Sequence, residues 1–255
     1  MNTQTPKIAL ITGGSRGLGR STAESLSRKG IDSVITYNSR ADEARKVVAA
    51  IQAEGRQAVA LQLDTGAVGT FIGFVEKLKN TLREIWGKHR FDFLINNAGT
   101  SHHNSFEKTT EEEMDILYNV HFKGVFFLTQ RLLPLLNEGG RIINLSSGLT
   151  RIIFPGSAAY GSMKGAIEVL TKYMAKELGP RRITVNVVAP GAIATDFSDG
   201  MVRDNPEINK RVADMTALGR VGLPDDIGPM IASLLSEDNR WVNAQRIEAS
   251  GGMSI

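Results

Sequence analysis

A tyrosine and a lysine one helical turn apart are the residues of this chain best suited to proton transfer. Tyr160 and Lys164 fall in a segment of helical period over residues 158–179, so their side chains share one face of the predicted helix. A free tyrosine has a pKa of about 10, and an ammonium group within about 4–6 Å favours the phenolate. The spacing therefore predicts a general acid/base pair in which Lys164 lowers the pKa of Tyr160.

A serine is placed to join this pair. Ser147 follows a predicted strand over Arg141–Ser146 and stands 13 positions before Tyr160. We expect its hydroxyl to hydrogen-bond a substrate oxygen and to hold that oxygen against the Tyr160 hydroxyl. A Tyr and a Lys at this spacing are more often packing plus a solvated charge, so the interpretation depends on the rest of the chain.

A glycine-rich turn follows the first predicted strand and leads into a predicted helix. It reads Thr12-Gly13-Gly14-Ser15-Arg16-Gly17-Leu18-Gly19. Glycine permits a tight turn and close approach of the backbone to a ligand. The free N–H groups and the dipole at the start of the helix then favour a phosphate. The spacing G-x₃-G-x-G differs from the usual dinucleotide fingerprint, so a tight turn without a ligand is the alternative.

The same turn also comes close to a P-loop. Gly14 to Ser21 reads G-x₄-G-R-S, one residue away from G-x₄-G-K-[ST]. The P-loop relies on a lysine to reach the β- and γ-phosphates, and Arg20 is a poor substitute for a compact ammonium. A nucleotide triphosphatase is therefore disfavoured.

The end of the second predicted strand indicates which dinucleotide would bind. An acid there would accept hydrogen bonds from the ribose hydroxyls of NAD, but the chain has Tyr37-Asn38-Ser39-Arg40. Asp32 lies at the wrong end of the strand, and Asp42 is already in the next helix. Arg16 and Arg40 could pair with a 2′-phosphate. NADP(H) is thus favoured over NAD(H), with ordinary surface arginines as the alternative.

Short apolar runs alternate with segments of helical period along the whole chain. The runs are mostly continuous, as expected for strands covered on both faces. The predicted strands are Ile8–Thr12, Ser33–Tyr37, Ala58–Leu63, Phe91–Asn96, Arg141–Ser146, Thr184–Val188 and Arg246–Ala249. The predicted helices lie near 18–29, 41–54, 68–86, 110–137, 158–179 and 225–236. This order predicts an α/β fold: one Rossmann-type, three-layer αβα domain over 1–255 with a mainly parallel sheet of about seven strands.

Two longer stretches interrupt the alternation, Thr100–Lys108 and Ala192–Gly222. Ligands of open parallel sheets bind beyond the carboxyl ends of the strands, so segments leaving those ends are candidates to cover a substrate. We therefore divide the chain into a cofactor and catalytic core (7–190), a covering segment (192–222) and a C-terminal helix and strand (225–255). The expected pocket residues are His102, His103, Phe154, Phe197 and Met201.

Composition excludes several classes of function. Of the 255 residues 42% are hydrophobic, and the net charge of +3 is too small to indicate nucleic-acid or membrane binding. With no cysteine there is no disulfide, thiolate zinc site or cysteine nucleophile, and the four histidines lack metal-ligand spacing, so no metal is expected. No apolar run is long enough to span a bilayer, and Met1 to Lys7 does not read as a signal peptide. We expect a cytoplasmic protein.

Taken in order, these motifs resemble the classical short-chain dehydrogenase/reductase family, from about Lys7 to the C-terminus. Several ordered motifs are far more specific than any one of them. The matching residues are Thr12-Gly13-x₃-Gly17-x-Gly19, Asn96-Asn97-Ala98-Gly99, Asn119, Ser147, Tyr160-x₃-Lys164 and Pro190-Gly191.

The resemblance implies a role for each matching residue. Tyr160 would be the catalytic acid/base, and Lys164 would lower its pKa and bind the nicotinamide ribose. Asn119 would kink its helix and hold a water of a proton relay to the lysine; otherwise it is a tolerated polar residue in a helix. The cofactor would be contacted at its adenine by Asp64 beside Thr65, along the adenosine ribose by Asn97, Ala98 and Gly99, and at the nicotinamide by Pro190, Gly191, Ile193 and Thr195.

The activity implied is hydride transfer between a nicotinamide and a small-molecule carbonyl or alcohol. Similar members include 3-oxoacyl carrier-protein reductases, sugar dehydrogenases and general carbonyl reductases, so the substrate stays open. A carrier-protein partner would suit a basic entrance, for which Arg131, Arg151 and Arg203 are candidates unless they are plain surface residues. The resemblance also implies a homo-oligomer, a tetramer rather than a dimer, through helices 110–137 and 158–179. A catalytically silent NADP-binding or sensor protein is the rival, against which the intact Ser147, Tyr160 and Lys164 argue.

Overall fold

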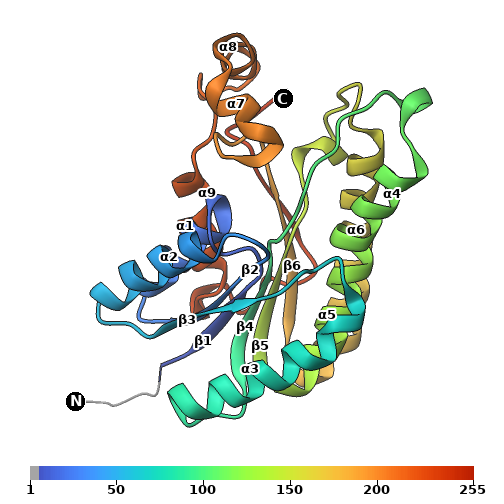
Figure 1. The fold of residues 1–255 in the computed structure, drawn as a ribbon. Coiled ribbons are helices and arrows are strands. Elements are labelled where there is room, and N and C mark those ends of the chain that lie inside the picture. The colour runs from blue at the N-terminus through green and yellow to red at the C-terminus, as the bar shows by residue number, and fades with distance from the viewer. Residues whose placement is uncertain (1–5) are drawn as a thin grey trace.

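The computed structural model describes residues 6–255. Residues 1–5, part of the N-terminal segment in which no signal peptide is expected, lie outside the described residues. In the described chain seven parallel strands form one sheet in the order β3-β2-β1-β4-β5-β6-β7 (Figure 1). The strands are β1 (Ile8–Ile11), β2 (Asp32–Tyr37), β3 (Ala58–Gln62), β4 (Phe91–Asn96), β5 (Leu136–Leu145), β6 (Thr184–Pro190) and β7 (Arg246–Ala249). The predicted parallel sheet is confirmed.

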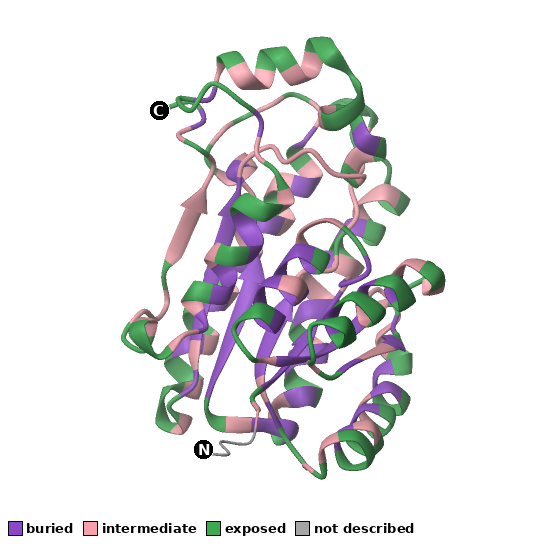
Figure 2. Cartoon of the chain, turned by 90° about the vertical axis from the view of Figure 1, so that its left-hand side faces the viewer, coloured by how far each residue is buried: buried purple, intermediate pink, exposed green. Residues whose placement is uncertain are grey.

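Helices cover both faces of this sheet. One face packs on α1 (Gly17–Arg28), α2 (Ala41–Ala53) and α9 (Pro224–Leu234), and the other on α3 (Phe71–Trp86), α5 (Gly124–Leu132) and α6 (Ala158–Leu178). Within β1, Ile8 and Leu10 belong to one core and Ala9 and Ile11 to the other. A strand buried on both faces needs apolar residues at every position, which explains its continuous apolar sequence. Figure 2 shows these buried strands at the centre of the molecule.

The prediction of one helix over 110–137 is wrong in two places, because the segment is interrupted by a π-turn and ends before residue 136. It divides into α4 (Glu111–Tyr118), a π-helical turn (Asn119–Lys123), α5 and a 3₁₀ turn (Leu133–Leu135), and residues 136–137 already belong to β5. In the π-turn the Gly124 N–H donates to the Asn119 carbonyl, five residues back instead of four. Gly124 lies so close to the Thr65 carbonyl that a Cβ would collide with it. At the end of the turn Gly124 therefore lies directly against the segment that follows β3.

The segment 192–222 leaves the end of β6 and returns to the same place. Its base is closed by hydrogen bonds from Ala194 N to Gly222 O (2.9 Å) and from Gly222 N to Ala192 O (3.0 Å). Between these ends it carries α7 (Met201–Asp204) and α8 (Pro206–Asp214), which stand above the sheet in Figure 1. Within residues 6–255 we find no helix long and apolar enough to cross a membrane.

Candidate active site

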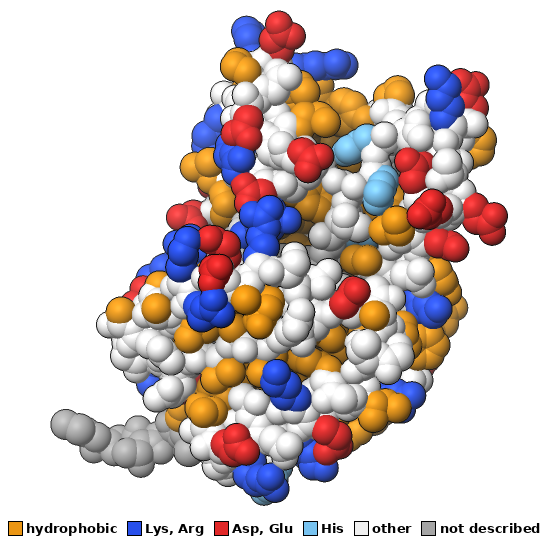
Figure 3. Space-filling view, viewed as in Figure 1, with side chains coloured by type: hydrophobic (Ala, Val, Ile, Leu, Met, Phe, Trp, Pro, Cys, Tyr) orange, Lys and Arg blue, Asp and Glu red, His pale blue; other side chains and the backbone are white. Residues whose placement is uncertain are grey.

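A cavity of about 640 Å³ opens beyond the carboxyl ends of the strands. In Figure 3 it is the hollow below the segment that carries α7 and α8, with hydrophobic side chains on its walls. Nearly every residue that the sequence predicts for the site lines it; Gly19 and Asn119 do not. Residues as far apart in the chain as Ser15 and Thr195 therefore face one space.

The glycine turn is held in shape by the loop after β4. The Thr12 hydroxyl accepts hydrogen bonds from the backbone N–H groups of Asn97 (2.9 Å) and Ala98 (3.0 Å). In return the Asn97 amide donates to the carbonyls of Thr12 (2.8 Å) and Gly13 (3.1 Å). Asn97 thus fixes the turn as well as lining the cavity, a role that its place in the sequence did not reveal.

The start of α1 is suited to a phosphate group. Gly19 packs so tightly on the Gly13 carbonyl that a Cβ would collide with it, which explains why Gly19 is buried beneath the turn instead of lining the cavity. The residue before the helix, Arg16, makes no side-chain cap, and the first turn holds no acidic residue. The helix N-terminus therefore presents N–H groups and a positive dipole end to the cavity, with no acidic side chain of its own first turn.

The far end of the cavity, at β2 and β3, is where the adenosine half of a dinucleotide would lie. Asn38, Ser39 and Arg40 line it after β2, and Asp64 and Thr65 line it after β3. The Asp64 carboxylate accepts the Gly66 N–H (2.8 Å). Arg16 also faces this space, and its guanidinium lies 3.3 Å from the Asp196 carboxylate of the covering segment.

Tyr160, Lys164 and Ser147 meet at the opposite end of the cavity. The Lys164 Nζ lies 5.5 Å from the centre of the Tyr160 ring and donates to the Leu145 carbonyl (2.8 Å). Ser147, extended at the end of β5, accepts the Leu149 N–H (3.2 Å) and hydrogen-bonds Tyr160. All three residues line this end of the cavity. Tyr160 is 8% exposed and Lys164 5% exposed, so the pair works in a dry environment.

Burial shifts the pKa of Tyr160 in the direction opposite to the predicted one. It raises the pKa of the phenol well above the ordinary value, and the hydrogen bond with Ser147 lowers it only in part. The same burial lowers the pKa of Lys164 to about 7, so the lysine carries its charge only part of the time near neutral pH. The expectation that Lys164 lowers the pKa of Tyr160 is therefore wrong for the protein chain on its own.

Asn119 does not line the cavity. It begins the π-turn and is half-buried. Two residues later, His121 does line the cavity, is 1% exposed and meets the Tyr160 ring edge-on with ring centres 5.2 Å apart. The sequence analysis missed His121 because an α-helical reading of this segment gives no sign of the π-turn.

The remaining walls are set by β6, the covering segment and the loop after β5. Pro190, Gly191, Ile193 and Thr195 line the cavity beside the Tyr160 group. Of the five expected pocket residues only His102 stays outside the lining. The apolar side chains gathered there are Leu149, Ile152, Phe154, Phe197, Met201, Val202, Ile208, Met215 and Met253.

Two of the three arginines considered for a basic entrance are engaged in ion pairs. Arg151 pairs with Glu248 and also donates to the carbonyls of Met253 and Ser254. Arg203 pairs with Asp196 and Asp204. Much of their charge is therefore compensated.

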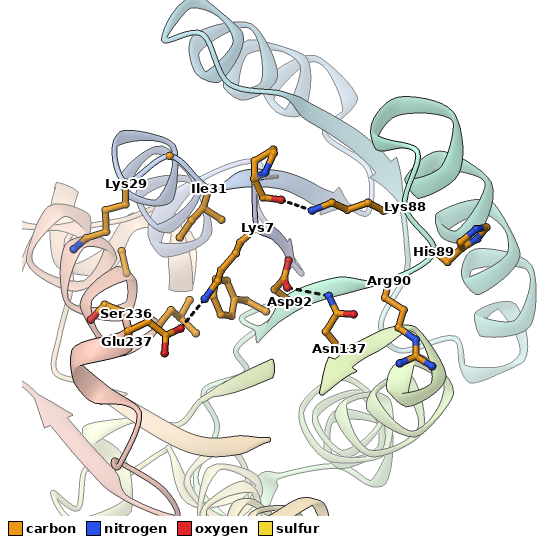
Figure 4. Close-up of a pocket in the computed structure, with 15 residues that line it drawn as sticks. Lys7, Lys29, Ile31, Lys88, His89, Arg90, Asp92, Asn137, Ser236 and Glu237 are labelled. Atoms are coloured by element: carbon orange, nitrogen blue, oxygen red, sulfur yellow. Dashed lines mark hydrogen bonds and ion pairs between the residues drawn. The ribbon is translucent and has the colours of Figure 1, made fainter. Parts of the chain in front are cut away.

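A second cavity, of about 750 Å³, lies at the amino ends of the strands (Figure 4). Here the Lys7 Nζ pairs with Glu237 (2.7 Å), and Lys88 donates to the Pro6 carbonyl (2.5 Å). Asp92 accepts the Ile8 N–H (2.8 Å) and the Asn137 amide (2.9 Å). These side chains hold chain segments together, and none of the residues predicted for the site lies here.

Known proteins resemble the chain over nearly its whole length. Residues 13–254 match the family model described as Enoyl-(Acyl carrier protein) reductase. A hydroxynaphthalene reductase-like protein of Metarhizium brunneum is 36% identical over 259 residues, covering 96% of this chain and 94% of its own.

Solved structures agree in both sequence and fold. The promiscuous reductase LugOII, described as catalysing keto-reduction at C1 during lugdunomycin biosynthesis, is 40% identical with a TM-score of 0.93, over 98% of this chain and 99% of its own. The angucycline C-6 ketoreductase LanV, solved with bound NADP, is 39% identical with a TM-score of 0.92, over 97% and 95%.

Proposed function

The chain belongs to the classical short-chain dehydrogenase/reductase family, and from this premise we propose that it is an NADP(H)-dependent reductase of ketones or aldehydes. The observation that carries the proposal is the single cavity in which a phosphate-binding turn and a buried Ser147–Tyr160–Lys164 group face one another. A silent nucleotide-binding protein would have no need to bury an ionisable pair, because such burial costs free energy.

The residues at the adenosine end favour NADP(H) over NAD(H). No acid follows β2 to bind ribose hydroxyls, and Arg16 and Arg40 line the cavity where a 2′-phosphate would be recognised. LanV, which is similar over most of its length, holds NADP. When bound, the nicotinamide supplies the hydride, and the protein supplies orientation and the proton.

The protonation states favour the direction of reduction. Because burial raises the pKa of Tyr160, the phenol keeps its proton and can donate it to a carbonyl oxygen. Ser147 holds that oxygen beside the phenol. Lys164, whose pKa is lowered to about 7, can pass a proton to Tyr160 at neutral pH. In this scheme Pro190, Gly191, Ile193 and Thr195 keep the nicotinamide ring facing the substrate.

The substrate we propose is a bulky, largely apolar ketone. The cavity wall near Tyr160 includes Ile152, Phe154, Phe197 and Met201. The polar side chains of Ser101, His103, Ser157 and Ser198 also lie there, but they hydrogen-bond one another. A sugar would leave its hydroxyls without partners on such a wall. A carrier protein is disfavoured because Arg151 and Arg203 are already paired. LugOII and LanV are described as ketoreductases of the lugdunomycin and angucycline type, which fits this choice.

We also propose that residues 192–222 cover the substrate and that copies of the chain assemble through the helices α5 and α6. Those helices expose Phe126 (39%), Val169 (54%) and Tyr173 (65%), an apolar set that a second copy could bury. The proposed assembly is a homotetramer.

The test is NADPH oxidation with a panel of polycyclic aromatic ketones, small sugars and 3-oxoacyl thioesters, repeated with NADH. We expect the fastest turnover with NADPH and an aromatic ketone. Tyr160→Phe should lower turnover by about 10²–10⁴-fold while NADPH binding, followed by fluorescence, survives. Wild-type protein that binds NADPH but reduces none of the ketones would support the silent protein instead.

A further inference from the structure

Glu168 is a carboxylate close to the Ser147–Tyr160–Lys164 group that the proposed reaction does not use. It follows Tyr160 and Lys164 at four-residue intervals on α6, so the three side chains lie along one face of the helix. Its side chain is 19% exposed, and within residues 6–255 all of its side-chain hydrogen bonds are accepted by one oxygen, Oε1. The donors to that oxygen show what Glu168 holds in place.

Two of the donors come from the segment that carries Ser147. The Ser146 hydroxyl donates to Glu168 Oε1 (2.7 Å), and the Thr150 hydroxyl donates to the same oxygen (2.8 Å). Thr150 also lies 3.0 Å from the Ser147 carbonyl, but its single proton is drawn to the carboxylate, because charged acceptors form the stronger hydrogen bonds. One oxygen thus ties both the residue before Ser147 and the turn after it to α6.

The third donor is Arg246 of β7. Its Nε donates to Glu168 Oε1 (2.8 Å), and its Nη2 donates to the Thr150 hydroxyl (3.0 Å). A hydroxyl has one proton and two lone pairs, so Thr150 can accept from the arginine and still donate to the carboxylate. Glu168, Thr150 and Arg246 therefore form a closed ring of hydrogen bonds, and the guanidinium balances the charge of the carboxylate.

The place of Ser147 depends on these contacts because β5 ends just before it. The last residue of β5 is Leu145, whose carbonyl accepts a hydrogen bond from Lys164 (2.8 Å), and Ser147 follows it in an extended conformation. Lys164 and Glu168 thus hold the chain around Ser147. Both come from α6, the helix that also carries Tyr160. Misplacing a group that orients substrate by about 1 Å can lower the rate by about 10²-fold.

We propose that Glu168 is a positioning residue: by anchoring Ser146 and Thr150 to α6, its carboxylate holds Ser147 in register with Tyr160. The proposal rests on the proposed function, in which Ser147 and Tyr160 hydrogen-bond one substrate oxygen. Glu168 does not line the cavity, and it gains and loses no proton in the reaction. Its removal should therefore slow the chemical step and leave the binding of NADPH unchanged.

Two substitutions separate the contacts of Glu168 from its charge. Glu168→Ala removes all three hydrogen bonds, whereas Glu168→Gln can place its amide oxygen where Oε1 lies and accept from the same donors. Glu177→Ala is the matched control, because Glu177 is an exposed carboxylate on the same helix. Each variant is also made together with Ser147→Ala, which shows whether Glu168 acts through Ser147. Melting temperatures report whether each protein folds.

With NADPH and an active ketone, we expect Glu168→Ala to lower kcat by about 10- to 100-fold, with the Kd for NADPH unchanged. Glu168→Gln should retain most of the activity, and Glu177→Ala should match wild type. In the Ser147→Ala background, adding Glu168→Ala should cause little further loss of kcat, because the hydroxyl that the carboxylate positions is already gone.

The proposal is overturned if Glu168→Ala is fully active. It is also overturned if the losses from Glu168→Ala and Ser147→Ala multiply, since the carboxylate would then act on something other than Ser147. A Glu168→Gln protein as impaired as Glu168→Ala would show that the charge matters and the anchoring contacts do not, which contradicts the proposal as well.

Should Glu168→Ala fail to fold, Thr150→Val takes its place, because it removes one of the two anchors and keeps the shape of the side chain. Thr150→Ser, which keeps the hydroxyl, is then the comparison. We expect a lower kcat for Thr150→Val, and equal activity of the two would overturn the proposal. These results are distinct from failure of the proposed function, which would appear as wild-type protein inactive on every ketone.

Discussion

The two ends of the sheet each carry a cavity, and volume does not tell them apart. The cavity at the amino ends holds about 750 Å³ and the one at the carboxyl ends about 640 Å³. At the amino ends Lys7 pairs with Glu237, and Asp92 accepts from Ile8 and Asn137, while Lys29 and Arg90 are exposed to water. At the carboxyl ends Lys164 and His121 are buried with hydrogen-bonding capacity left over. Uncompensated burial of ionisable groups, more than volume, marks the functional end.

Because all strands run in the same direction, the two ends of the sheet differ in what surrounds them. Helices begin after the carboxyl ends of parallel strands, so helix N-termini, free N–H groups and long connections gather there. Segments entering the amino ends are short and close-packed. Substitutions at one end should therefore affect turnover, and those at the other end should affect folding.

The largest effect should come from Lys164→Met. Removing the ammonium takes away the proton source of Tyr160, so kcat should fall by about 10²–10⁴-fold. Stability should rise at neutral pH, because the variant no longer buries a group that prefers to be charged in water. Lys172→Met, at an exposed position on the same helix, is the control and should change neither quantity much. A Lys164→Met protein that is less stable than wild type would contradict the comparison.

The lowered pKa of Lys164 also predicts how the free energy of unfolding changes with pH. Burial lowers the pKa of Lys164 to about 7 in the folded protein, against about 10.4 for an unfolded lysine. Between these values the unfolded chain binds more protons than the folded one, so this residue makes the free energy of unfolding rise as the pH increases. Urea unfolding at pH 7 and pH 9 should show this rise in wild type and a smaller one in Lys164→Met.

At the amino ends of the strands, we expect Asp92→Ala to have an intermediate effect, on the free energy of unfolding. The change leaves the Ile8 N–H and the Asn137 amide without their acceptor, which should cost about 2 kcal/mol of the free energy of unfolding. Activity of the folded fraction should be unchanged. Asp92→Asn, which keeps an oxygen for the Ile8 N–H, should lose less. A fall in kcat without a loss of stability would show that the two ends are coupled.

The smallest effect concerns Asp196→Asn at the rim of the functional end. Its carboxylate pairs with Arg16 at 3.3 Å, and exposed pairs of this kind contribute about 0.2–1 kcal/mol. Releasing Arg16 should tighten NADPH binding up to about fivefold and NADH binding by less. Asp204→Asn is the control, because Asp204 pairs with Arg203 and not with Arg16. Equal gains for both cofactors would argue against a 2′-phosphate role for Arg16.

The parts of the site that depend on local spacing could be predicted from the sequence. The face shared by Tyr160 and Lys164 follows from helical period, and the glycine turn follows from backbone sterics, so both were predictable. The π-turn was not, because local spacing does not show the close contact between Gly124 at its end and Thr65, some 60 residues away. That one turn exchanges Asn119 for His121 in the cavity. The pKa of Tyr160 also escaped prediction, since it depends on burial by the folded chain.

The covering segment has a consequence for how this protein can change over generations. Its base is fastened by the hydrogen bonds between Ala194, Ala192 and Gly222, yet among the described residues none from 196–222 belongs to the hydrophobic clusters that flank the sheet. Mutations there alter the wall that faces a substrate while leaving the main folding free energy intact. A lineage could thus exchange this segment for a new substrate range, and a laboratory could transplant it between relatives at the same two anchor points.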